Sequence, residues 1–156
     1  MPEDKIKELI EAAIQARSMS YAPYSHYMVG AALLAGDGQI FKGCNIENAA
    51  YTPTNCAERT AFFKAVSEGI TDFTAIAVVG SPEGDEITQL AYPCGVCRQV
   101  MMEFCDPKTF HVIVARSVAE YRCMTLEELL PCGFGSDNVK GNEATLRLQS
   151  TQSKSS

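Results

Sequence analysis

The stretch CAERTAFFKAVSEG (56–69), followed after a short break by FTAIAVVG (73–80), decides the fold. The first run is rich in good helix formers and stops at Gly69, which predicts a helix with Asn55 or Thr54 as its N-cap. The second run is short, apolar and rich in β-branched residues, which predicts a buried strand. A helix followed directly by a buried strand indicates an α/β protein.

The remaining chain continues this alternation. Apolar residues recur at steps of three and four in 4–18, which predicts an amphipathic helix on Ile6, Leu9, Ile10, Ala13 and Ile14. Strands are expected at 27–35, 39–44 and 109–115, and helices at 94–105 and 125–131, with GDG (36–38) as a hairpin signal. The pattern predicts a three-layer α/β/α sandwich with a mixed sheet. We expect a single domain over 1–140 and a C-terminal tail, 141–156, largely disordered at its polar end.

Composition excludes several classes of partner. The 156 residues carry a net charge of −6, with a sequence pI near 4.9, and a field of that sign repels nucleic acid and anionic membranes. No apolar run approaches the roughly 18 residues of a membrane span. The N-terminal MPEDKIKELI lacks the apolar core of a signal peptide, and the seven cysteines cannot all pair. We therefore expect a cytoplasmic protein that acts on a small molecule and keeps its thiols reduced.

The run YPCGVCRQV (92–100) contains a C-x-x-C motif at a predicted helix start. Cys94 and Cys97 are compatible with a redox dithiol, half of a structural zinc site, or two ligands of a catalytic zinc. Cys56 also begins a predicted helix, where the free N–H groups and the macrodipole favour a thiolate. Three such sulfurs could converge on one zinc ion and leave its fourth position open, as catalytic zinc requires.

Glu58 and Arg59 follow Cys56 within one helical turn. A carboxylate beside a zinc ion can move protons between an activated water molecule and a substrate. A non-ligand glutamate close to one metal-ligating residue, followed later by P-C-x-x-C, is the pattern of zinc deaminases. The Arg59 guanidinium can hydrogen-bond the thiolates and draw negative charge away from the metal, although a solvated helix face is the alternative for this residue.

The motifs VGAALL (29–34), GCNIENAAY (43–51), CAERTA (56–61), PCGVCRQVM (93–101) and EELLP (127–131) occur in the same order as in one known family. On these motifs, the chain resembles the short, homotetrameric cytidine deaminases from about residue 4 to residue 140. The resemblance implies a mixed five-stranded sheet flanked by helices, one zinc ion per subunit, and sites completed by neighbouring subunits. It also implies hydrolysis of cytidine and deoxycytidine to the uridine nucleosides with release of ammonia.

The resemblance assigns roles by position. Zinc ligands would be Cys56, Cys94 and Cys97, and Glu58 would move protons among the water, ring N3 and the leaving amine. Substrate contacts would come from Asn45, Glu47, Tyr27, Ala57, Tyr51 and Phe134. Asn45 and Glu47 would bind the ribose hydroxyls, Tyr27 would stand where the family usually has Phe against the base, and Phe134 would reach a neighbouring site. A polar turn remains the alternative for NIEN (45–48), and core packing for the two rings.

Other residues are expected to be structural. Cys44, Cys105, Cys123 and Cys132 are predicted to pack in the interior, and His26 and His111 to have structural roles. Tyr92 departs from the family, which often has a small residue before the Pro-Cys pair.

Four other functions share some of these sequence features. A thioredoxin-like redox protein leaves Cys56 and Glu58 unexplained, and a structural zinc-binding interaction module would need a fourth ligand at close spacing. A polynucleotide-editing deaminase conflicts with the acidic charge and the lack of interleaved basic and aromatic residues. An aminohydrolase of a related aminopyrimidine nucleoside or nucleoside antibiotic is the alternative within the enzyme class.

Overall fold

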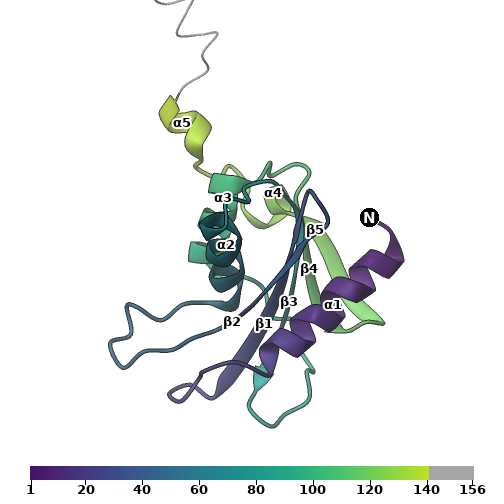
Figure 1. Cartoon of the computed structure of the whole chain (residues 1–156), viewed down its shortest axis with the longest axis vertical. Coiled ribbons are helices and arrows are strands. Elements are labelled where there is room, and N and C mark those ends of the chain that lie inside the picture. Colours follow the sequence, from purple (N-terminus) through teal and green to yellow (C-terminus); the bar gives the residue numbers. More distant parts are fainter. Residues whose placement is uncertain (141–156) are drawn as a thin grey trace, which may run out of the picture.

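Figure 1 shows the computed structural model of the chain, which describes residues 1–140. A five-stranded sheet, in the order β2-β1-β3-β4-β5, has helices on both faces. The strands are β1 (Tyr27–Ala35), β2 (Ile40–Cys44), β3 (Phe73–Pro82), β4 (His111–Ser117) and β5 (Glu120–Thr125). The helices are α1 (Glu3–Arg17), α2 (Ala57–Ser67), α3 (Gly95–Phe104), α4 (Leu126–Leu129) and α5 (Ser136–Lys140).

The sheet is mixed. Strands β3 and β4 are parallel, and α3 lies in the crossover that joins them. The β1–β2, β1–β3 and β4–β5 pairs are antiparallel. The predicted α/β/α sandwich with a mixed five-stranded sheet is therefore confirmed.

Two hydrophobic cores lie on opposite faces of the sheet. Helices α2 and α3 cover one face, where Phe62 and Met101 are buried against alternate strand residues such as Leu33. Helix α1 covers the other face, where Leu9 and Ile10 are fully buried. Strand β3 is buried along nearly its whole length because helices cover both of its faces.

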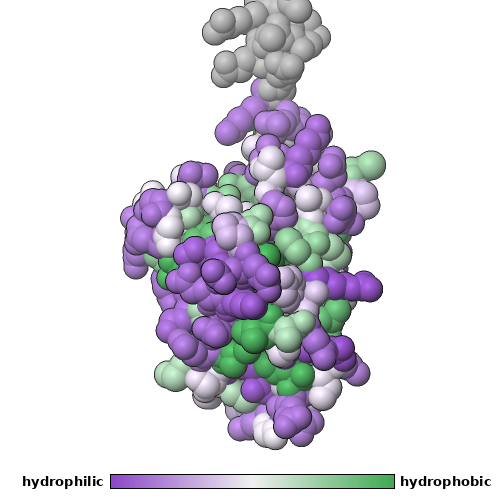
Figure 2. Space-filling view, turned by 90° about the vertical axis from the view of Figure 1, so that its right-hand side faces the viewer, coloured by the Kyte–Doolittle hydropathy of each residue, from purple (hydrophilic) through white to green (hydrophobic). Residues whose placement is uncertain are grey.

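The face of the molecule shown in Figure 2, which lies to the right in Figure 1, is mostly hydrophilic, with hydrophobic residues in smaller groups.

Helix α1 buries Ile6, Leu9, Ile10 and Ala13 as predicted, but Ile14 is 37% exposed. Ile14 lies at the margin of the apolar stripe, next to the face of the helix that is exposed to solvent.

Several local predictions need correction. The predicted elements lie within two residues of the observed ones, but β5 and α5 were not expected from the residue pattern. The N-cap of α2 is Cys56, with extended backbone and no side-chain cap bond, rather than Asn55 or Thr54. Cys123 and Cys132 are exposed, whereas Cys44 and Cys105 are half-buried. The expected disorder concerns 141–156, outside the described residues.

Gly43 brings α2 close to the edge strand β2. A Cβ atom added there would lie 2.4 Å from the carbonyl oxygen of Ala57 and 2.5 Å from the backbone nitrogen of Ala61. Only glycine permits this approach of a helix backbone to a strand. The contact sets the position of the first turn of α2, which carries the residues discussed next.

Candidate metal centre

Two helix starts meet at the candidate site. Cys56 is the N-cap of α2, and Cys94 is the N-cap of α3, both with extended backbone. Cys97 lies in the first turn of α3, and its backbone N–H donates to the Cys94 Sγ at 3.5 Å. Unpaired N–H groups at a helix start stabilise negative charge, so each helix favours thiolates at this point.

The three sulfurs fit a tetrahedral zinc ion. The Cys56 and Cys94 Sγ atoms are 3.8 Å apart, the Cys94 and Cys97 Sγ atoms are 3.5 Å apart, and all three lie within 4.8 Å of one another. Zn–S bonds of about 2.3 Å in tetrahedral geometry require sulfurs about 3.8 Å apart. Within the described residues, this cluster offers three ligand atoms, which leaves the fourth zinc position for water or substrate.

The charges of the thiols also suit a cation. Hydrogen bonding to Cys97 lowers the pKa of Cys56 to about 5, despite its burial, and Arg59 adds to the effect. The same hydrogen bond, together with burial and the Glu58 charge, raises the pKa of Cys97. All three sulfurs can be thiolates together only when a cation offsets their mutual repulsion, as zinc does.

Arg59 lies against this cluster. Its Nη2 donates to the Cys56 Sγ at 3.2 Å. Burial acts to lower the pKa of Arg59, but hydrogen bonds to Cys56 and Cys97 outweigh it and raise the pKa. Its Nε is buried without a hydrogen-bond partner in the described part of the chain. The guanidinium is thus held toward the sulfurs rather than toward solvent.

Glu58 is a buried carboxyl group beside the thiols. Only 4% of its surface is exposed, and this burial raises its pKa, against the opposing hydrogen bond to Cys97. A carboxyl group with a raised pKa can both accept and return a proton near neutral pH. Glu58 lies in the first turn of α2 and lines the space in front of the sulfurs.

A cavity of about 280 Å³ opens in front of this centre. The predicted site residues Tyr27, Asn45, Cys56, Ala57, Glu58 and Cys94 line it. The Tyr27 ring forms one wall and lies close to Gly80, where an added Cβ would be 3.1 Å from its Cε1 atom. The structure therefore brings together sulfurs, a buried acid, an amide and an aromatic ring.

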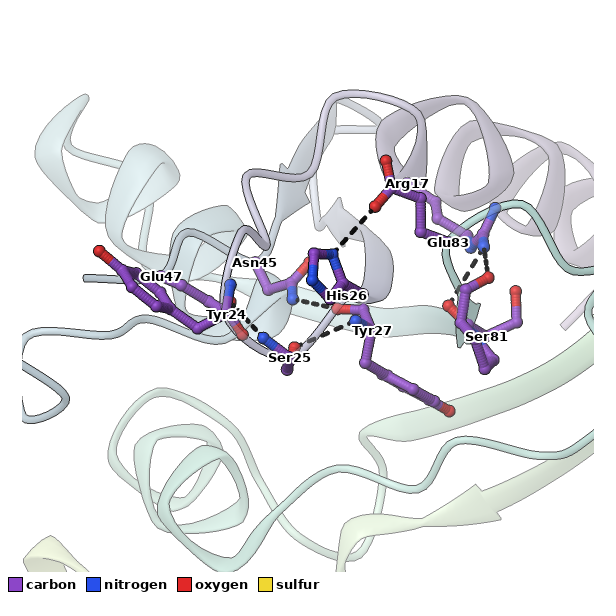
Figure 3. A network of polar contacts seen from close by, with 10 residues as sticks. Arg17, Tyr24, Ser25, His26, Tyr27, Asn45, Glu47, Ser81 and Glu83 are labelled. Carbon is purple, nitrogen blue, oxygen red and sulfur yellow. Dashed lines mark hydrogen bonds and ion pairs between the residues drawn. The ribbon is translucent and has the colours of Figure 1, made fainter. Parts of the chain in front are cut away.

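Three predicted substrate residues lie outside the lining of this cavity. The Glu47 Oε1 accepts hydrogen bonds from the backbone nitrogens of Tyr24 and Ser25, both at 3.0 Å (Figure 3). Tyr51 is 78% exposed and packs edge-on against Tyr24, and Phe134 is 61% exposed. Neither ring packs in the core, so the core-packing alternative is wrong for Phe134.

Six further residues line the cavity that the sequence did not predict as site residues, namely Val29, Thr54, Asn55, Val78, Ala91 and Tyr92. Thr54 and Asn55 directly precede a predicted ligand, so their proximity could have been expected. Val78 and Ala91 come from β3 and the loop after it, and only the topology brings them to the site.

Comparison with known proteins agrees with this geometry. A family model described as "Cytidine and deoxycytidylate deaminase zinc-binding region" matches residues 3–113. The chain belongs to this deaminase family. Cytidine deaminase from Sporosarcina psychrophila is 48% identical over 134 residues, which cover 86% of this chain and 94% of that protein.

Further relatives of this deaminase bear on fold and substrate. The crystal structure of cytidine deaminase from Burkholderia pseudomallei has a TM-score of 0.73 at 48% identity and covers 81% of this chain and 97% of its own. Blasticidin-S deaminase from Bacillus cereus is 35% identical over 130 residues, which cover 81% of this chain and 90% of that protein. The family match names a zinc-binding region, and Cys56, Cys94 and Cys97 are positioned to bind the ion.

A second cavity in this deaminase is larger but lacks the groups that the chemistry needs. A larger cavity, of about 490 Å³, lies by Thr88–Leu90 and β5, but its lining contains no cysteine and no buried acid. We place the chemistry in the smaller cavity for that reason.

Among residues 1–140, no helix is both long and apolar enough to cross a membrane.

Proposed function

We propose that this protein hydrolyses cytidine and deoxycytidine to uridine and deoxyuridine and releases ammonia. The observation that supports this most is the convergence of three thiols with the buried carboxyl group of Glu58 at the end of one cavity. That arrangement supplies a metal site with an open position and a proton carrier beside it. Family membership narrows the reaction to deamination.

The chemistry requires one bond to form and one to break at C4 of the base. Zinc held by Cys56, Cys94 and Cys97 would act as a Lewis acid and lower the pKa of a water molecule to about 7. Glu58 would accept one proton from the attacking water and give it to ring N3 as the C4–O bond forms. It would then accept the remaining proton of the new C4 hydroxyl group and give it to the amino group, which leaves as ammonia when the C4–N bond breaks. Burial suits Glu58 to this work because its raised pKa makes both transfers accessible.

Arg59 adjusts the charge of the thiolate cluster. Three thiolates with one zinc ion carry a net charge of −1, which weakens the pull of the metal on water. The hydrogen bond from the Arg59 Nη2 to Cys56 withdraws part of that charge. Arg59 therefore acts through the sulfurs and has no contact with the substrate in this proposal.

The other end of the cavity recognises the nucleoside. The Tyr27 ring is available to pack against the base, and Ala57 lies beside the reacting end. Asn45 also lines the cavity, and together with Glu47, two positions further on, it would bind the sugar hydroxyls. Neutral hydroxyl groups suit an amide and a carboxylate, whereas a 5′-phosphate would be repelled by Glu47 and by the net charge of −6. We therefore propose nucleosides rather than nucleotides as substrates.

A related nucleoside antibiotic is the second candidate substrate, because blasticidin-S deaminase is among the relatives. The cavity of about 280 Å³ is at the small end of the range for ligand sites, which favours a compact nucleoside.

Ultraviolet absorbance tests the substrate class. The purified protein is incubated with cytidine, deoxycytidine, CMP, adenosine and blasticidin S. Loss of the cytosine band with the two pyrimidine nucleosides alone is the expected result. Turnover of blasticidin S but not of cytidine would replace the proposed substrate with the antibiotic.

The exposed aromatic rings support a shared site in a homotetramer. Phe134 lies between Gly133 and Gly135 and is 61% exposed, and Tyr51 is 78% exposed. Large rings exposed to this degree favour contact with another molecule. We propose that Phe134 of one subunit closes the cavity of a neighbour and that Tyr51 lies at the boundary between them.

Subunit mixing tests this assembly. Inactive Glu58→Gln subunits and impaired Phe134→Ala subunits are dissociated, mixed and reassembled, and native mass spectrometry confirms the hybrids. Some hybrid sites would then contain both intact residues, so activity should exceed the sum of the separate variants. Hybrids without any gain would mean that Phe134 serves only its own chain.

The reducing cytoplasm is the compartment we propose. All seven cysteines are free, and three of them must remain thiolates to hold a metal ion. A reducing compartment keeps such thiols available.

A further inference from the structure

We propose that Ser25 is a positioning residue that holds two predicted substrate contacts, Tyr27 and Glu47, in a fixed relation to each other. This inference rests on the proposed function, because it assigns Tyr27 to the base and Glu47 to the sugar. Ser25 itself would touch neither part of the nucleoside.

The contacts of Ser25 extend in two directions (Figure 3). Its Oγ accepts a hydrogen bond from the Tyr27 backbone nitrogen at 3.0 Å. Its own backbone nitrogen donates to the Glu47 Oε1 at 3.0 Å, next to the similar bond from Tyr24. Both bonds use the same carboxylate oxygen, so Oε2 keeps its lone pairs for a hydroxyl group of a ligand.

The turn that contains Ser25 needs such an anchor. The next residue, His26, has φ of 56°, a left-handed conformation that few residues other than glycine adopt. Its carbonyl oxygen accepts from the Glu83 nitrogen, and its Nδ1 lies 3.3 Å from the Glu83 Oε2. These contacts fix the middle of the turn, and Ser25 fixes its entry.

Tyr27 is then held at both ends of its backbone. Its nitrogen donates to Ser25, and its carbonyl oxygen accepts from the Asn45 Nδ2 at 2.7 Å. The Asn45 Oδ1 accepts from the Val29 nitrogen at 2.9 Å, which ties the same amide to β1. Ser25, Tyr27, Asn45 and Glu47 thus form one connected network, of which Tyr27 and Asn45 line the cavity.

The electrostatics agree with this role. The Ser25 hydroxyl group is the largest cause that lowers the pKa of Glu47, and the Ser25 backbone amide is the next. The Ser25 backbone amide, which donates to the Glu47 Oε1 at 3.0 Å, therefore helps to keep this carboxylate ionised, and the Ser25 hydroxyl group acts in the same direction. Ser25 is exposed, so its side chain contributes little to the core.

The alternative is that Ser25 only stabilises its own turn. Four variants separate the two roles: Ser25→Ala, Ser25→Thr, Glu47→Gln, and the Ser25→Ala/Glu47→Gln double variant. The matched control is Ser18→Ala, which removes another exposed hydroxyl group with one hydrogen bond, to the Gln15 carbonyl oxygen at 2.7 Å, at the end of α1. Steady-state kinetics are measured with cytidine and with 2′,3′-dideoxycytidine, which lacks the sugar hydroxyls proposed for Glu47.

Ser25→Ala should raise the KM for cytidine about 3- to 10-fold and change kcat by less than about 2-fold, since binding rather than chemistry is perturbed. Discrimination between cytidine and 2′,3′-dideoxycytidine should fall by a similar factor, and Ser25→Thr should restore it. In the Glu47→Gln background, Ser25→Ala should raise KM by a clearly smaller factor than in the wild type, because only its effect through Tyr27 then remains. Ser18→Ala should match the wild type.

Two results would overturn the proposal. Ser25→Ala with an unchanged KM and unchanged discrimination would show that the hydroxyl group positions nothing. Independent, multiplicative effects of Ser25→Ala and Glu47→Gln on KM would show that Ser25 does not act through the carboxylate. Failure of the proposed function is distinguishable, because the wild-type protein would then deaminate neither pyrimidine nucleoside.

Discussion

Replacing Gly43 with alanine should force the edge strand β2 away from α2, the helix that begins after Cys56 and carries Glu58. The new Cβ would lie 2.4 Å from the Ala57 carbonyl oxygen and 2.5 Å from the Ala61 nitrogen, both backbone atoms that cannot rotate away. Ordinary contact begins near 3.4 Å, so one element must move by about 1 Å. Crowding of this kind costs about 1–3 kcal/mol of stability, and a displacement of 1 Å in a catalytic constellation costs about 10²-fold in rate.

The direction of the movement determines which half of the site is lost. Displacement of α2 carries Cys56 and Glu58 away from Cys94, so zinc content should fall together with activity. Displacement of the edge strand β2 instead carries Asn45 away from the cavity, so zinc would be retained while KM rises. Either movement lowers kcat/KM for cytidine about 10²-fold. Zinc analysis beside steady-state kinetics distinguishes the two.

Two further glycine variants serve as controls. A Cβ at Gly95, the first residue of α3, meets no atom within 4 Å, so Gly95→Ala should fold at least as well as the wild type and keep its zinc. A Cβ at Gly30 would lie 2.0 Å from the Ala13 carbonyl oxygen, so Gly30→Ala should destabilise the α1 layer without removing zinc directly. Activity within about 2-fold and stability within about 0.5 kcal/mol of the wild type for Gly43→Ala would show that β2 and α2 accommodate the added Cβ without moving.

Three other outcomes are expected. Glu58→Gln should lower kcat by several orders of magnitude at an unchanged zinc content near one per chain, because the amide cannot carry the proton. Metal analysis beside a turnover assay checks this, and retained turnover would assign the proton transfer to another residue. Cys94→Ala should lose both zinc and activity. Arg59→Gln should retain zinc and lose only about 10- to 100-fold in rate, because the loss of Arg59 changes the charge of the cluster rather than its coordination. Equal zinc loss in both variants would contradict the proposed role of Arg59 in adjusting that charge. Hydrogen bonds from Ser25 and Tyr24 lower the pKa of Glu47, so the stability that this carboxylate contributes should be present above its ordinary pKa of 4.5 and lost as pH falls through the lower folded-state value. Denaturant unfolding between pH 3 and 7 should therefore show a stability difference between the wild type and Glu47→Gln that shrinks toward pH 3. A stability difference that grows on acidification would contradict this expectation.

The residues on helix starts could be predicted from the sequence because their geometry is local. Cys56 and Glu58 share one turn of α2, and Cys94 and Cys97 share one turn of α3, so a spacing of two or three positions determines how they face. The periodicity of α1 and the apolar run of β3 identified the layers for the same reason. Short-range spacing also explains why Arg59 was expected beside the sulfurs.

Other parts of the structure depend on contacts far apart in the sequence. Strand β5 lacks the alternation of buried and exposed residues that marks a strand, and it is ordered by pairing with β4. Val78 and Ala91 reach the cavity only because β3 lies at the centre of the sheet. Ser25 has no motif of its own, and its partner Glu47 lies 22 positions away.

The two helix starts that supply the sulfurs have a consequence for the chain as a polymer. Cys56 and Cys94 are 38 positions apart, and the segment between them contains all of α2 and β3. A metal ion bound by both would act as a cross-link in a protein whose cysteines are all free, and closing a loop of that length restricts the unfolded chain by about 4 kcal/mol on the scale used for disulfides. Removal of the ion would therefore lower the free energy of unfolding of the whole domain as well as stop the reaction, so chelation should lower the melting temperature even in a variant that is already inactive, such as Glu58→Gln.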